Sequence, residues 1–299
     1  MKKMFGVCVA MTTSFDKNGN VDFEEMNRHA EMLIRNGVHG LYPNGTTGEC
    51  MHLTIAERKR LAEEMVKTAA GRVVVFSQVG APTLEETIEL AKHAEACGCD
   101  GIGVVTPFYH GVTDREMEEF YVDVASAVSE NFPVYIYNIP ACSGNDIKPE
   151  VAKRVMERCK NVIGIKYSSP DVRRTMDYLK IGDVSFMHGV DRLGTTWYAM
   201  GCDGVISGGA DAFPEPYVAC YEEWKKGNTE ESLRMMDACY ELNVLMNGFR
   251  GIKQAITYRG LKGGAHRKPI LDLPEAEVAA INKKLDAYVA KWGFSKTYN

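Results

Sequence analysis

The sequence predicts an α/β fold: a (β/α)8 TIM barrel with a helical C-terminal extension. Apolar, strand-like runs alternate with amphipathic helical runs, which is typical of a parallel sheet, and eight strand candidates are present. A glycine recurs where a helical run ends (Gly37, Gly98 and Gly201), and a short apolar run follows about three residues later. The rival fold, an open doubly wound sheet, requires a glycine-rich phosphate loop after the first strand, and residues 12–16 lack one.

Local patterns support each element in turn. The expected strands cover the ranges 6–13, 40–44, 73–79, 101–106, 133–138, 162–168, 184–189 and 204–208. The clearest helical patterns between them cover 22–36, 54–69, 83–97 and 113–129. Thr54 and Glu57 have the spacing of a capping box, which indicates that a helix begins there. After about residue 213 the pattern is helical only, so we expect a barrel over residues 1–225 and a helical extension of the same domain over 226–299.

Composition excludes several classes of protein. The 299 residues are 45% hydrophobic and 25% charged, as in ordinary globular proteins. The net charge of −5 argues against nucleic-acid binding, which requires a basic face. No run approaches the ~18 apolar residues of a membrane span, and the first residues are too polar for a signal peptide. Nine cysteines, an odd number, fit a reducing cytoplasm better than a disulfide framework, so we expect a cytoplasmic protein.

Lys166 is the residue that most constrains function. It lies in an otherwise apolar run, residues 162–168, that reads as a buried strand. Lysine is rarely buried without a partner, and an ammonium group in an apolar site responds by a fall in its pKa, which yields a nucleophilic amine. The alternative is a lysine at a strand end whose ammonium reaches water. The segment alone leaves both interpretations open.

Other strand ends also carry chemistry, because barrel active sites lie at the C-terminal ends of the strands. Residues 43–49 form a glycine-bracketed turn whose N–H groups could hold an anion, although glycine, asparagine and threonine are also common in ordinary turns. Tyr135 and Tyr137 share one face of a strand, where a phenol could relay protons or simply pack. Ser168 lies on the same face as Lys166, one step nearer the barrel mouth.

Three motifs together resemble one family. Residues 44–49 (Asn-Gly-Thr-Thr-Gly-Glu), 137–140 (Tyr-Asn-Ile-Pro) and 164–166 (Gly-Ile-Lys) resemble those of the dihydrodipicolinate synthase / N-acetylneuraminate lyase family, in order and spacing over nearly the whole chain. The resemblance implies class I aldolase chemistry on a small 2-oxo acid and an aldehyde, with no metal and no organic cofactor. It also implies a homotetramer built as a dimer of dimers.

The same resemblance assigns residue roles. Lys166 would form the Schiff base and Tyr137 would shuttle protons, while Thr46 would connect Tyr137 to Tyr109 of a neighbouring subunit. The carboxylate of the 2-oxo acid would be held by Thr47 and the backbone from Gly45 to Gly48. The full set of expected substrate-binding residues is Gly45, Thr47, Gly48, Ser168, Cys142, Asp191, Arg192, Ser207 and Gly208.

The chain departs from both named branches where the second substrate would be chosen. The synthase branch has an arginine where this chain has Cys142, and a thiol cannot replace a bidentate carboxylate clamp. The lyase branch has an aspartate–glutamate pair where this chain has Asp191 and Arg192. We therefore expect a 2-keto-3-deoxy acid or an N-acetylneuraminate-like substrate. The alternatives are a dihydrodipicolinate synthase of lysine biosynthesis and a non-catalytic sensor that binds a 2-oxo acid.

Two other features are expected to be structural. Cys97 and Cys99 flank Gly98 and are better explained as a helix end than as a metal site, because no His or Cys cluster lies nearby in sequence. His188 has no neighbouring histidine or carboxylate at metal-ligand spacing. A metal-dependent aldolase is therefore not expected.

Overall fold

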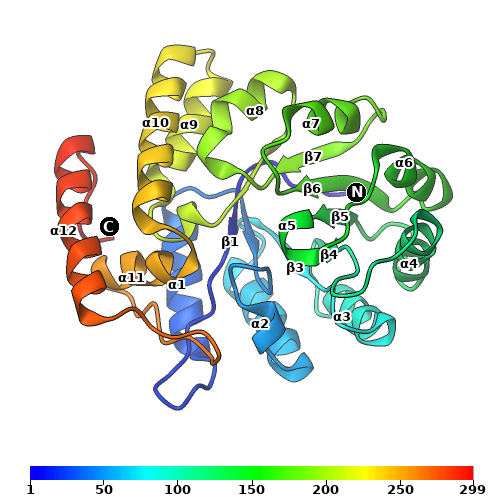
Figure 1. Cartoon of the computed structure of the whole chain (residues 1–299), viewed down its shortest axis with the longest axis horizontal. Helices are drawn as coiled ribbons and strands as arrows, with labels where there is room; N and C mark the ends of the chain where they lie inside the picture. The colour runs from blue at the N-terminus through cyan, green and yellow to red at the C-terminus, as the bar shows by residue number, and fades with distance from the viewer. Residues whose placement is uncertain (299) are drawn as a thin grey trace.

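The computed structural model describes residues 1–298 and contains eight parallel strands closed into a barrel (Figure 1). The strands follow one another in chain order, and β8 pairs with β1 to close the ring. The predicted (β/α)8 barrel is thus confirmed. The strands are β1 (Gly6–Ala10), β2 (Gly40–Tyr42), β3 (Val74–Gln78), β4 (Gly101–Val105), β5 (Val134–Asn138), β6 (Val162–Tyr167), β7 (Ser185–His188) and β8 (Gly204–Ser207).

Helices surround the barrel, and their first turns explain where they begin. Asp22, Thr54, Thr83 and Thr113 each accept a hydrogen bond from the backbone N–H three residues later, and the capping box of Thr54 and Glu57 is formed. The helices are α1 (Phe23–Arg35), α2 (Ile55–Ala69), α3 (Leu84–Ala96), α4 (Asp114–Ser126), α5 (Pro140–Ser143), α6 (Pro149–Arg158), α7 (Val172–Leu179), α8 (Gly194–Met200), α9 (Pro214–Lys225), α10 (Thr229–Met246), α11 (Phe249–Tyr258) and α12 (Glu275–Trp292), with 3-10 turns at Cys50–His52, Asp191–Leu193 and Gly209–Asp211.

The recurring glycines end helices α1, α3 and α8 in one way. Gly37, Gly98 and Gly201 have φ of 82°, 90° and 102°, a left-handed conformation that costs glycine little. The N–H groups of each glycine and of the residue after it bond back to the last helical turn, as in a Schellman motif. The repeated pattern in the sequence is therefore a repeated helix-to-strand turn.

Every strand is somewhat shorter than predicted, and the first two end more than one residue early. The first was expected over 6–13 and ends at Ala10, because Thr12 leaves the sheet and donates from its N and Oγ1 to Asp211 Oδ2 at 2.8 and 2.7 Å. The second was expected over 40–44 and ends at Tyr42, and Asn44 has a φ of 62°, outside the extended region. The residues released in this way form loops at the barrel mouth.

Apolar side chains fill the barrel interior below its mouth. The interior cluster consists of Met4, Cys8, Ala10, Tyr42, Phe76, Tyr135, Met187 and Ile206, each at most 4% exposed. A larger apolar layer lies between the barrel and the helices. The interior is therefore a packed floor rather than a channel, and any reacting group must lie above it.

The helices α10, α11 and α12 follow the barrel and lie together on one side of it (Figure 1). A buried ion pair ties them to the mouth: Lys253 Nζ on α11 lies 2.6 Å from Glu49 Oε1, and both side chains are at most 2% exposed. Lys253 Nζ also donates to the Ala265 carbonyl at 2.8 Å. Within residues 1–298, none of the helices has the length and apolar character to span a membrane.

Candidate active site

Lys166 lies near the C-terminal end of β6 and points into the barrel. The register of β5 and β6 sets it beside Tyr137. Its Nζ lies 3.8 Å from the centre of the Tyr137 ring and 4.4 Å from the centre of the Tyr42 ring. The residue is only 4% exposed, so the side chain does not reach water in the way a surface lysine does.

This burial changes the acid–base chemistry of the amine. Removal from water lowers the pKa of Lys166 from 10.5 to about 7. No carboxylate forms an ion pair with it in the part of the chain described, and the weaker attractions of Cys50, Cys8, Asp191 and the two ring faces offset only part of that effect. Near pH 7 about half of the molecules would carry a neutral, nucleophilic amine at this position.

Tyr42 is a part of the site that sequence reasoning missed. It is fully buried, its ring lies below Lys166, and its Oη has no hydrogen-bond partner among residues 1–298. Gly103 on β4 leaves the space for this phenol, because a Cβ at that position would lie 1.9 Å from Tyr42 Oη. A glycine inside a strand often marks such a close approach, so Gly103 was the available signal.

Tyr137 connects the lysine to a hydroxyl on the mouth turn. Its Oη lies 3.1 Å from Thr46 Oγ1, and the nearby Ser168 hydroxyl, like that of Thr46, acts to lower the pKa of the phenol. Burial raises the pKa of Tyr137 to about 12, so the phenol stays protonated at neutral pH. Gly189 gives Ser168 its space, since a Cβ there would lie 1.9 Å from Ser168 Oγ. The structure thus brings Thr46, Tyr137, Lys166 and Ser168 close to one another.

The turn over residues 43–49 presents free backbone donors. Gly45 O accepts bonds from the N–H groups of Gly48 and Cys50 at 3.1 and 3.3 Å, which folds the turn back on itself. The N–H groups of Thr46 and Thr47 make no hydrogen bond to any of the described residues. Outward N–H groups in a turn of this kind suit an anion such as a carboxylate.

Two glycines hold this turn against its neighbours. A Cβ at Gly48 would lie 2.8 Å from the Met11 carbonyl, so only glycine permits this approach to the loop after β1. Across the mouth, a Cβ at Gly208 would lie 3.3 Å from Thr47 Oγ1. Gly45, Thr47 and Gly48 therefore belong to one tightly held turn, and Gly208 packs against Thr47 from the loop after β8.

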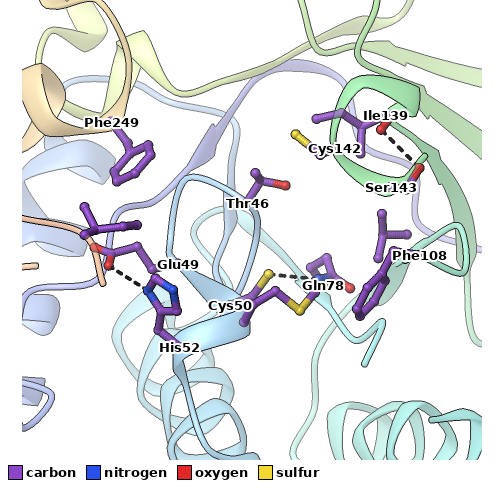
Figure 2. A pocket seen from close by; sticks show the side chains of 13 residues that line it. Thr46, Glu49, Cys50, His52, Gln78, Phe108, Ile139, Cys142, Ser143 and Phe249 are labelled. Carbon is purple, nitrogen blue, oxygen red and sulfur yellow. Dashed lines mark hydrogen bonds and ion pairs between the residues drawn. The ribbon is translucent and has the colours of Figure 1, made fainter. Parts of the chain in front are cut away.

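A cavity of about 240 Å³, partly open to solvent, adjoins Thr46. Figure 2 shows Thr46 in the middle of the view, with Cys142 and Ile139 on one side and Glu49 and His52 on the other. Cys142 is exposed and lies on the short helix α5. The lining contains no lysine or arginine; it consists of Thr46, Glu49, Cys50, Met51, His52, Gln78, Val105, Phe108, Ile139, Cys142, Ser143, Phe249 and Ile270.

Asp191 and Ser207 lie near the mouth, but their polar atoms are engaged within the protein. Asp191 Oδ2 accepts bonds from Ser207 Oγ at 2.7 Å and from the Gly209 N–H at 3.0 Å, and the residue is buried. Its other oxygen faces Asn243 Nδ2 at 3.4 Å. Arg192 Nη1 also donates to Asn243, at 3.4 Å. These contacts tie Asp191 and Ser207 to the loop after β8, whereas the Arg192 guanidinium makes a single side-chain bond, to Asn243, within residues 1–298.

Tyr109 does not complete the site of its own chain. It has a φ of 74° and is 91% exposed, which directs its phenol into solvent. His188 is also outside the reactive group: it stacks on Trp197 at 3.6 Å, and its two nitrogens face the Val190 N–H and Thr175 Oγ1. Burial lowers the pKa of His188 to about 3, so it is a neutral packing residue. No group of three possible metal ligands is found within residues 1–298.

The barrel places a buried lysine without an ion pair at a strand end. A tyrosine lies beside this lysine, and a nearby turn has backbone N–H groups without partners among the described residues. This architecture is that of a lyase or aldolase for small molecules. The chain belongs to the dihydrodipicolinate synthetase family, whose model matches residues 3–288. It is 34% identical to an uncharacterised DapA-like lyase of Halobacterium salinarum, over 94% of this chain and 93% of the relative. It is 35% identical to a probable 2-dehydro-3-deoxy-D-pentonate aldolase, YjhH, of Escherichia coli, over 76% of this chain and 77% of that one. The solved structure of Escherichia coli YagE in complex with pyruvate superposes with a TM-score of 0.91 at 27% identity, over 95% of this chain and 98% of YagE.

Proposed function

We propose that this protein is a class I aldolase that cleaves a 2-keto-3-deoxy acid to pyruvate and a neutral aldehyde, or condenses the two. The observation that carries the proposal is Lys166: a lysine amine that is buried, without an ion pair, and 3.8 Å from the ring of a tyrosine that bonds to a threonine hydroxyl. A structural lysine gains nothing from such a position, whereas a nucleophile needs the neutral amine.

The proposed reaction begins when Lys166 Nζ attacks the keto carbon and water leaves, which forms a protonated imine. Tyr137 then takes the proton of the C4 hydroxyl while its own phenol proton passes to Thr46 Oγ1 and the Thr46 proton passes on to water; the C3–C4 bond breaks, and its electrons pass into the imine to give an enamine. The aldehyde departs, a proton returns through Thr46 and Tyr137 to C3, and hydrolysis returns pyruvate and the free amine. The N–H groups of Thr46 and Thr47 would hold the carboxylate throughout.

The cavity lining supports a neutral aldehyde. It contains no arginine or lysine, and Cys142 occupies the position of the synthase-branch clamp. An aldehyde with its own carboxylate, as in the synthase alternative, would bring a second negative charge with no cation to meet it. Asp191 and Ser207 bond to each other, and Asp191 also accepts a bond from the Gly209 N–H. These bonds leave few free groups for the hydroxyls of an N-acetylneuraminate-like substrate.

We also infer a homotetramer, in which Tyr109 of a neighbouring chain completes the relay from Tyr137 through Thr46. The exposure of Tyr109 supports this inference, since an isolated chain leaves the phenol in solvent. All nine cysteines are free, which fits the expected reducing cytoplasm. Sedimentation velocity would measure the oligomeric state, and Tyr109→Phe should lower turnover without loss of pyruvate capture.

The test of the function uses pyruvate and borohydride. Borohydride should fix pyruvate on the peptide that contains Lys166, with no adduct on Lys166→Ala; absence of the adduct from the unaltered protein would end the Schiff-base proposal and leave the sensor alternative. A panel of aldehydes then addresses the substrate. Glycolaldehyde and glyceraldehyde should condense faster than aspartate semialdehyde. Cleavage of unsubstituted N-acetylneuraminate at ordinary aldolase rates would contradict the smaller substrate.

A further inference from the structure

A pair of cysteine thiols lies at the other end of the barrel from Lys166. Cys97 and Cys99 occupy the turn between α3 and β4, at the N-terminal end of β4 (Figure 1). Their sulfur atoms are 3.9 Å apart. Within residues 1–298 no other two cysteines have sulfurs in such contact.

The helix-ending turn itself brings the thiols together. Cys97 is the C-cap of α3, Gly98 has a φ of 90°, and Cys99 donates its N–H to the Ala94 carbonyl at 2.9 Å. The last two features define a Schellman motif, in which the residues before and after the left-handed glycine flank the turn. The equivalent turn at Gly201 has Met200 before the glycine and Cys202 after it, so the same geometry there supplies only one thiol.

The two thiols have different access and acidity. Cys97 is half-buried and so meets solvent, whereas Cys99 is only 6% exposed. The hydrogen bond from Cys99 lowers the pKa of Cys97 to about 7, while the same contact and burial raise the pKa of Cys99. The thiolate is the nucleophile in disulfide exchange. Cys97 therefore has the character of an attacking thiol, and Cys99 that of a protected second thiol within reach.

We propose that Cys97 and Cys99 form a redox-active dithiol that is oxidised to an internal disulfide by low-molecular-weight disulfides. The Cys97 thiolate attacks one sulfur of the small disulfide, and one small thiol leaves. Cys99 then attacks the Cys97 sulfur of the mixed disulfide, the second small thiol leaves, and the Cys99 proton passes to it. The protein loses two electrons and two protons, and the small disulfide gains both.

The geometry permits the ring to close. A disulfide bond is about 2.0 Å long, so the sulfurs must approach by about 2 Å. Gly98 is exposed, and a Cβ there would meet only Val66 Cγ1 at 3.6 Å, so the turn has room to adjust. The dithiol requires nothing from the proposed aldolase chemistry, and it lies at the opposite end of the strands.

Oxidised glutathione, peptide mapping and two single variants test the proposal. Trypsin releases residues 93–115 as one peptide that contains Cys97 and Cys99 and no other cysteine. After treatment of the intact protein and alkylation of the remaining thiols, this peptide should lack two hydrogens and carry no glutathione. Cys99→Ser should instead keep glutathione on Cys97, and Cys97→Ser should leave the peptide unmodified.

Cys142 serves as the internal control, because it is exposed and its sulfur contacts no other thiol in the described chain. Burial raises the pKa of the Cys142 thiol, so the treatment is run at about pH 9 to increase its thiolate fraction. Under these conditions Cys142 should carry glutathione in every variant, which proves that the reagent reached the protein. A peptide 93–115 with two free thiols, or with glutathione still attached in the unaltered protein, would overturn the proposal. Capture of pyruvate by borohydride should be the same in Cys97→Ser, so failure of one proposal remains distinct from failure of the other.

Discussion

Replacement of Lys166 by methionine should make the protein more stable while it removes pyruvate capture. Folding takes the lysine out of water, and this desolvation lowers its pKa from 10.5 to about 7. That fall corresponds to a penalty of about 5 kcal/mol, at about 1.4 kcal/mol for each pKa unit. Methionine is unbranched and apolar, and its sulfur packs well against rings such as those of Tyr42 and Tyr137. The variant therefore removes a cost of folding and keeps the contacts.

The gain in stability from Lys166→Met should depend on pH, and the direction of that dependence follows from the lowered pKa of Lys166. Between pH 7 and 10.5 the unfolded lysine binds a proton that the folded one does not, so the stability of the unaltered protein rises with pH over that window. The gain from Lys166→Met should be close to its full value at pH 6. It should fall below about 0.5 kcal/mol as the pH reaches 10.5, where neither state holds most of the proton.

Denaturant unfolding at pH 6, 8 and 10 would measure the gain, with Lys291→Met as the matched control. The Lys291 side chain is 56% exposed, so its replacement should change the free energy of unfolding by less than about 1 kcal/mol at every pH. A Lys166→Met variant that is no more stable than the unaltered protein at pH 6 would refute the reasoning. So would a gain that does not shrink toward pH 10, since desolvation of a charge could not then be its source.

Three further predictions follow from the same contacts. Tyr137→Phe should lower turnover by roughly 10²- to 10⁴-fold, because that is the usual contribution of a positioned proton-transfer group. Borohydride should still trap pyruvate on this variant. An equal loss of trapping would show that the phenol acts in binding instead. Tyr42→Phe keeps the ring below Lys166 and removes a buried hydroxyl that has no partner among residues 1–298. The pH–rate profile of imine formation should therefore keep its midpoint near pH 7. A midpoint that moves by a full pH unit would contradict the packing role of Tyr42. Lys253→Ala should destabilise the fold by about 3–5 kcal/mol in denaturant unfolding, because it removes the cation bound to the buried Glu49 Oε1 and leaves that carboxylate only its weaker contacts with His52 and the Arg267 N–H. A loss of less than about 1 kcal/mol would mean that the buried pair contributes no more than a surface one.

The sequence by itself determined the barrel and the inward face of its key strands. Glycine-ended helices and alternating apolar runs are local patterns, and they record the turn geometry and the burial of each element. The period of two along a strand was enough to set Ser168 on the same face as Lys166, and Tyr135 on the same face as Tyr137. The strand ends were set too late by up to three residues, because the bonds that end β1 come from Asp211, far away in sequence.

Closure of the barrel decided the chemistry of the site. Lys166 has a low pKa because side chains from several strands form a dry floor beneath it, and no local pattern encodes that exclusion of water. The Tyr42 ring under the amine depends on the missing side chain of Gly103, sixty-one positions away. Likewise, Asp191 was expected to bind substrate, and in the folded protein Ser207 and the Gly209 N–H in the loop after β8 bond to its carboxylate. Periodicity fixes which way a side chain points, whereas hydration and partners depend on what other segments bring to the same place.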